Sequence, residues 1–107
     1  MRRTLILTSD EAEALREFGH QVRRARLRRN MSQAELAERT GVTRKVVVAM
    51  EAGAQSSGLA FVAKVLAVFG YAGRLGDLLK DDPIGEDLVD VHGRQRARRR
   101  DDGVADF

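Results

Sequence analysis

The feature that most constrains this 107-residue chain is a tight turn between two short helical segments. Ser32 begins the first segment and Glu35 follows three residues later, which is the spacing of a capping box. Gly41 ends this segment, because glycine readily adopts the left-handed conformation that stops a helix. Thr43 is a typical N-cap for the second segment, which Gly53 closes.

The apolar residues of these two segments are placed to form one small core. Leu36 and Ala37 precede the turn, Val42 lies within it, and Val47 and Met50 follow it. Ala37 is small, so the two helices can approach closely at that point. This pattern predicts a helix-turn-helix unit, whose second helix projects outward with a width that fits the major groove of DNA.

Further helices are predicted on both sides of this unit. A helix capped by Ser9 or Asp10 runs to Asn30, with apolar residues three or four apart. After the unit, Ser56 or Ser57 opens a helix that Gly70 ends. Its predicted apolar set is Leu59, Phe61, Val62, Val65, Leu66 and Phe69. A short fifth helix is expected over residues 74–79, so the fold class is all-α with five helices.

The chain is predicted to have three parts. Residues 1–9 form an extension in which residues 4–8 favour either a short strand, paired with a second copy, or a frayed end. Residues 10–80 hold the predicted helices. Residues 81–107, where Pro83 breaks the pattern, form a polar, arginine-rich tail whose composition is typical of a segment that is disordered alone.

The positive charge is unevenly distributed. The chain has 19 basic and 16 acidic residues, a net charge of +3. Two runs are rich in arginine: Arg16, Arg23, Arg24, Arg26, Arg28 and Arg29 form the first, and Arg94, Arg96, Arg98, Arg99 and Arg100 form the second. Clustered arginine suits a polyanion such as DNA, and a solvated helix face followed by a soluble tail is the alternative interpretation.

Several residues that often carry chemistry have no suitable neighbours. His20 and His92 are isolated, without a partner at the spacing of metal ligands. The acidic pairs at 81–82 and 101–102 lack a basic partner, which favours solvation over catalysis. We therefore predict no metal, no cofactor and no enzymatic activity.

The sequence also predicts a cytoplasmic protein. It contains no cysteine, which fits a reducing compartment. No apolar run approaches the roughly 20 residues that span a bilayer, and residues 4–7 are too short for the core of a signal peptide.

Residues 18–53, with the sequence FGHQVRRARLRRNMSQAELAERTGVTRKVVVAMEAG, resemble the Xre/Cro-type helix-turn-helix family. The residues that match the family's pattern are Arg26, Ser32, Gln33, Leu36, Ala37, Gly41, Val42, Thr43, Glu51 and Gly53. With the following helices the resemblance extends over residues 18–79. It implies a five-helix, lambda-repressor-like domain that binds double-stranded DNA.

The resemblance also implies roles for individual residues. Gln33 and Thr43 are expected at phosphates, and Arg44 and Lys45 at base edges. Val48 and Ala49 are expected on outward or flanking faces, where the family favours polar residues. An outward valine can contact a thymine methyl group or a protein partner. Arg26 and Glu51 are expected to form a structural ion pair.

The resemblance further implies a homodimer on an inverted-repeat operator, with half-sites roughly 34 Å apart. The candidate dimer surfaces are Leu75, Leu78 and Leu79, or the residues 5–7. The tail, through residues 82–85 and 94–100, resembles that of HipB-type antitoxins, which repress their own operon and bind a kinase-like toxin. A stand-alone, prophage or restriction–modification controller repressor is an alternative, and so is a protein-interaction module without DNA binding.

Overall fold

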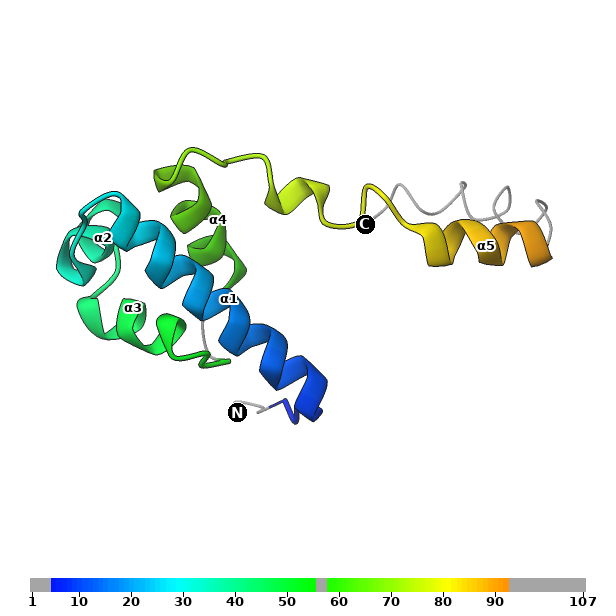
Figure 1. The fold of residues 1–107 in the computed structure, drawn as a ribbon, viewed down its shortest axis with the longest axis horizontal. Helices are drawn as coiled ribbons and strands as arrows, with labels where there is room; N and C mark the ends of the chain where they lie inside the picture. The colour runs from blue at the N-terminus through cyan, green and yellow to red at the C-terminus, as the bar shows by residue number, and fades with distance from the viewer. Residues whose placement is uncertain (1–4, 56–57, 93–107) are drawn as a thin grey trace. The chain divides into compact units, whose positions relative to one another are not determined.

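The structure is a computed structural model that describes residues 5–55 and 58–92. Its elements are α1 (Ser9–Arg28), α2 (Gln33–Thr40), α3 (Arg44–Glu51), α4 (Leu59–Val68), a short 3-10 helix η1 (Leu75–Asp77) and α5 (Pro83–His92) (Figure 1). No strand occurs in these ranges, so the predicted all-α fold with five α-helices is confirmed. The chain divides after Leu75 into two compact units, here called the first and the second unit.

The first unit is built around α1–α4. Helix α2 packs against α3 and α4, and α1 packs against α3. Leu36, Val47 and Val65 are fully buried at the centre. The core is completed by Val22, Met31, Ala37, Met50, Phe61 and Phe69. Each fully buried aliphatic side chain of this size contributes about 1.5–3 kcal/mol through its removal from water.

Helix α1 begins one residue earlier than the sequence indicated. Thr8, rather than Ser9 or Asp10, is the N-cap. Its hydroxyl accepts a hydrogen bond from the Glu11 amide at 3.2 Å, and its own amide donates to the Glu11 carboxylate at 3.0 Å. This complete capping box explains the correction, because Thr8 has a glutamate three residues on. Residues 5–8 form no strand, and residues 1–4 of the predicted extension lie outside the described residues.

The ends of α2 follow local signals. Ser32 accepts from the Glu35 amide at 3.0 Å, while the Glu35 carboxylate pairs with Arg39 at 3.2 Å instead of completing the capping box. Gly41 then adopts a φ of 82°, and its amide donates to the Ala37 carbonyl at 2.9 Å. A side chain there would strain the backbone, so this glycine sets the angle at which α3 follows α2.

Helix α4 differs in part from the expected pattern. Gly58 is its N-cap, and Ser56 and Ser57, the predicted caps, lie outside the described residues. Leu59 was expected in the core but is 69% exposed. It stands two residues before the buried Phe61, and two helical residues are about 200° apart around the axis, so Leu59 points away from the core.

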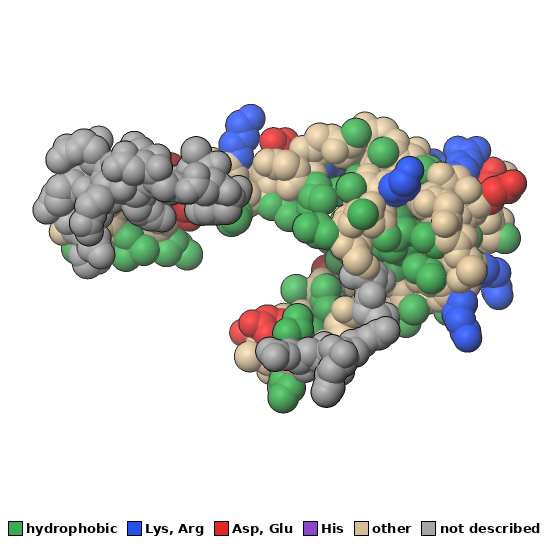
Figure 2. All heavy atoms as spheres, turned by 180° about the vertical axis from the view of Figure 1, so that it is seen from behind, with side chains coloured by type: hydrophobic (Ala, Val, Ile, Leu, Met, Phe, Trp, Pro, Cys, Tyr) green, Lys and Arg blue, Asp and Glu red, His purple; other side chains and the backbone are tan. Residues whose placement is uncertain are grey.

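The second unit departs most from the sequence prediction. The helix expected over residues 74–79 is only the 3-10 helix η1, and Leu78 and Leu79 beyond it are 72% and 83% exposed. Hydrophobic side chains of this unit are visible at the surface in Figure 2.

The fifth helix lies after Pro83 instead. Proline is the first residue of α5, a position where its missing amide and fixed φ are tolerated. The Asp82 carboxylate accepts from the Gly85 amide at 3.0 Å, which satisfies one of the free amides at the start of the helix. The sequence analysis treated Pro83 only as a helix breaker and so expected no helix in residues 83–92.

Candidate nucleic-acid interface

A buried ion pair joins α1 to the end of α3. Arg26 donates through Nε to Oε2 of Glu51 at 2.7 Å and through a terminal nitrogen to Oε1 at 2.9 Å, and the two side chains are 7% and 4% exposed. The other terminal nitrogen of Arg26 donates to the Met31 carbonyl at 2.9 Å. The hydrogen bonds to Glu51 raise the pKa of Arg26 while burial opposes them, so Arg26 stays charged. Two parallel hydrogen bonds fix the relative orientation of α1 and α3.

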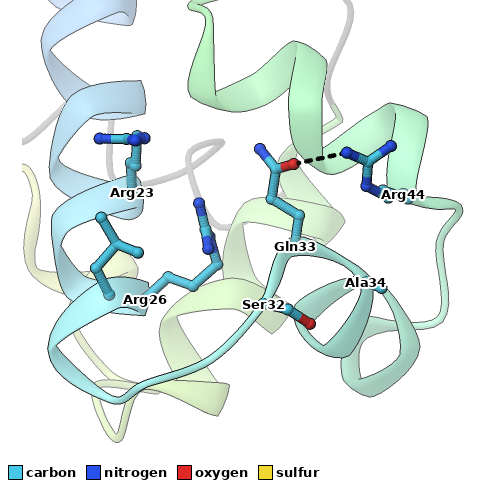
Figure 3. Close-up of a pocket in the computed structure, with 7 residues that line it drawn as sticks. Arg23, Arg26, Ser32, Gln33, Ala34 and Arg44 are labelled. Carbon is cyan, nitrogen blue, oxygen red and sulfur yellow. Dashed lines mark hydrogen bonds between the residues drawn. The ribbon is translucent and has the colours of Figure 1, made fainter.

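Gln33 connects this ion pair to the start of α3. Its Nε2 donates to Oε1 of Glu51 at 3.1 Å, and its Oε1 accepts from Arg44 at 3.3 Å (Figure 3). The side chains of Arg26, Glu51, Gln33 and Arg44 therefore form one polar network that runs from α1 to the first residue of α3. The network holds Arg44, which is exposed, beside the N-terminus of α2.

A pocket of about 410 Å³ opens next to this network. It is lined by Arg23, Arg26, Leu27, Ser32, Gln33, Ala34 and Arg44 (Figure 3). The lining contains three arginines and no carboxylate, and it includes the first residues of α2. Amide groups and the positive end of the helix dipole at a helix N-terminus favour anions. The pocket therefore suits a phosphate group.

The remaining predicted DNA-binding residues lie at or along α3. Thr43 is its N-cap, is exposed, and makes no capping hydrogen bond, so its hydroxyl remains able to bind another group. Lys45 is exposed, Val48 is 39% exposed and Ala49 is half-buried. Residues four apart in a helix share a face, so Lys45 and Ala49 lie on one side and Arg44 and Val48 on the next. Together these residues present a basic leading turn with an apolar surface behind it.

Comparison with known protein families gives a match to the helix-turn-helix family over residues 22–74, which span α2, the turn at Gly41 and α3. The match supports the resemblance of these residues to a helix-turn-helix domain of the Xre/Cro type. The match supports a DNA-binding transcriptional regulator, and proteins of the matched family are typically not enzymes. Comparison with curated proteins gives no match.

The helix-turn-helix domain contains one pocket residue that sequence reasoning did not single out. Arg23 lines the pocket beside α2, although the sequence analysis placed it only within an arginine-rich run. The available signal was its spacing: Arg23 is three residues before Arg26, and residues three apart share a helix face.

Gly19 was also missed. It lies inside α1 of the helix-turn-helix domain, where α1 passes the end of α3. A methyl group added at Gly19 would lie 2.5 Å from the Met50 carbonyl oxygen and 2.7 Å from that of Glu51. Only glycine permits this approach, and a glycine within an otherwise strong helical pattern is the signal that could have found it.

In residues 5–55 and 58–92, no helix is long and apolar enough to cross a bilayer. The same part of the chain holds no group of three or more acidic or histidine side chains arranged to bind a metal ion.

Proposed function

We propose that the chain is a sequence-specific transcriptional repressor that binds an inverted-repeat DNA operator as a homodimer. The observation that carries this proposal is the polar network, which holds the exposed Arg44 at the leading turn of α3 beside a pocket suited to phosphate. Proteins of this family bind DNA, typically as dimers, which supports the two-fold arrangement.

The phosphate contacts are assigned to residues around the start of α2 and α3. Gln33 has a second amide hydrogen on Nε2 beyond the one directed at Glu51, and the α2 amides lie beside it. Arg23 adds a positive charge on the opposite wall of the pocket. The Thr43 hydroxyl reaches a neighbouring phosphate. These contacts position the domain on the duplex without reading its sequence.

The base contacts are assigned to α3. Arg44 donates one hydrogen bond to Gln33 and keeps further N–H groups, so it can bind the two acceptors of a guanine in the major groove. Lys45 reaches a neighbouring base. Val48 and Ala49 lie one turn further along and suit the methyl group of thymine, which explains apolar residues at an outward position.

An affinity measurement tests this assignment. A duplex selected from a random pool by the wild-type protein serves as the operator, and binding is followed by fluorescence anisotropy at several salt concentrations. Arg44→Ala should weaken binding by about 1–3 kcal/mol. Arg39→Ala is the matched control, because Arg39 is an exposed arginine that pairs with Glu35 on α2. Equal effects of the two substitutions would contradict the assignment.

The salt series also separates DNA binding from a pure protein-interaction module, which the apolar Val48 and Ala49 on α3 would otherwise suit. Binding through several phosphates should weaken by orders of magnitude between about 50 and 200 mM salt. A protein that selects no duplex and binds only a protein partner, with little dependence on salt, would favour the interaction module.

A narrower role as an autoregulating antitoxin, with a kinase-like toxin as partner, rests on the charged tail. Residues 94–100 contain five arginines and follow a compact DNA-binding domain, as in HipB-type antitoxins. Coexpression with the product of the neighbouring gene tests it. Copurification of a kinase-like protein, and relief of its toxicity by this chain, would support the role. Repression of its own operon without any such partner would favour a stand-alone repressor.

A further inference from the structure

A second pocket lies on a different surface of the first unit. It has a volume of about 220 Å³ and lies between α1 and the end of α4. Its apolar floor includes Val22, Leu66 and Phe69, and its rim includes Arg28, Arg29 and Arg74. We call it the arginine-rimmed groove. It shares no lining residue with the pocket beside α2.

Two of the three rim arginines, Arg29 and Arg74, are held in place by contacts within the first unit. Arg29 donates to the carbonyls of Ala25 and Phe69 at 2.8 and 2.9 Å, and its guanidinium lies 4.8 Å from the centre of the Phe69 ring. The Arg74 guanidinium lies 3.8 Å from the centre of the Tyr71 ring. Within the described part of the chain, none of the three rim arginines forms an ion pair, and no carboxylate lines the groove. The groove therefore suits an apolar segment with negative charge at its edge.

Helix α5 is an apolar segment with negative charge at its edge. Ile84, Leu88 and Val91 are spaced by four and three residues, so they share one face, and they are 75%, 52% and 76% exposed. Asp87 lies about 60° around the helix axis from Ile84, at the border of this face. In the ranges that the structure describes, Asp87 forms no ion pair.

We infer that, in the homodimer, α5 of each copy docks in the arginine-rimmed groove of the other copy. The apolar face of α5 covers the floor of the groove, and Asp87 faces the rim arginines. The inference rests on the proposed homodimer and names the surface that forms it.

A second copy is the occupant because the proposed homodimer needs an interface, and these two surfaces can supply one. Within the second unit the face of α5 is exposed, and within the first unit the groove is open. A reciprocal exchange about a two-fold axis covers both surfaces in both copies, and it closes the assembly at two chains. Opposite charges at the edge of such an interface favour this pairing over α5 against α5, where the Asp87 side chains of the two copies would come together.

Two charge-reversed proteins test the exchange. The groove variant carries Arg28→Glu and Arg74→Glu, and the helix variant carries Asp87→Arg. Each variant alone would place like charges together, so its self-association should weaken by about tenfold or more relative to wild type. Mixed in equal amounts, the two variants match at both interfaces: the acidic groove meets the basic helix, and the basic groove meets the acidic helix.

Sedimentation equilibrium and native mass spectrometry, both without DNA, give the readout. We expect a wild-type dimer, two weakened variants and restored heterodimers in the mixture. Glu86→Arg is the matched control, because Glu86 lies on the opposite face of α5 and should leave the dimer unchanged. Restored heterodimers also show that both variants are folded.

Three results would overturn the inference: a wild-type protein that remains monomeric, variants that dimerise like wild type, or a mixture that forms no heterodimer. Because no DNA is present, these results are independent of the proposed DNA contacts. Loss of DNA binding by a protein that still passes the mixing test would instead reject the proposed function alone.

Discussion

The first unit buries large apolar side chains, whereas the second unit leaves them exposed to solvent. In the first unit, Leu36 and Val65 are completely buried among α1–α4. In the second unit, Leu79 and Val91 are 83% and 76% exposed. The comparison teaches that the first unit builds a core of its own, whereas the second unit leaves large apolar side chains at its surface.

Charged side chains repeat this contrast within the first unit. The Arg26–Glu51 pair is almost fully buried and hydrogen-bonded on several sides, whereas the side chains of Arg39 and Glu35 are 53% and 44% exposed. A buried pair fixes geometry, while an exposed pair contributes little because water screens it. The same interaction therefore has a structural role in one place and almost none in the other.

The largest effect is expected where that buried pair is broken. Glu51→Ala leaves the Arg26 guanidinium buried without an anion and removes an acceptor from Gln33. It should lower the free energy of unfolding by about 3–5 kcal/mol, measured by urea denaturation. Glu35→Ala is the matched control and should cost at most about 1 kcal/mol. Similar losses in both variants would remove the distinction between the two pairs.

A pair of leucine truncations compares the two units directly. Leu36→Ala should cost about 2–5 kcal/mol, because it leaves a cavity among α2, α3 and α4. Leu88→Ala, measured at protein concentrations where the chain is monomeric, should change the free energy of unfolding by no more than about 0.5 kcal/mol. A large loss from Leu88→Ala in the monomer would mean that α5 belongs to a core of the single chain.

A glycine substitution gives a smaller but more specific effect. Alanine normally stabilises a helix interior relative to glycine by about 1 kcal/mol. Gly19→Ala should instead destabilise the domain by about 1–3 kcal/mol, because the new methyl group overlaps the backbone at the end of α3. Gly76→Ala in the second unit has open space and should be nearly neutral. Thermal unfolding of both variants measures the difference, and a gain in stability from Gly19→Ala would disprove the close approach.

Local signals predicted the central part of the fold. Ser32, Gly41 and Thr43 mark the ends of α2 and α3, because caps and left-handed turns depend on neighbouring residues alone. The sequence did not predict the exposure of Leu59 or the helix after Pro83, since the first depends on tertiary packing and the second on a proline that starts a helix as readily as it breaks one.

The residues of the candidate site could be predicted from the sequence, but the hydrogen bonds between them could not. The resemblance to a known family named Gln33, Arg44 and the pair Arg26–Glu51. It did not indicate that Gln33 joins that pair to Arg44, because hydrogen bonds between residues 18 and 11 positions apart depend on how the helices pack. The mutual placement of their side chains supports the proposal that these residues bind DNA.

The central claim is that the leading turn of α3 reads base edges, and base preference tests it most directly. Wild-type protein, Arg44→Ala and Arg23→Ala are each used to select duplexes from the same random pool. Arg44→Ala should lose the preference at one position of each half-site, whereas Arg23→Ala should bind all selected sequences more weakly with the preference intact. An unchanged preference in Arg44→Ala would contradict the claim.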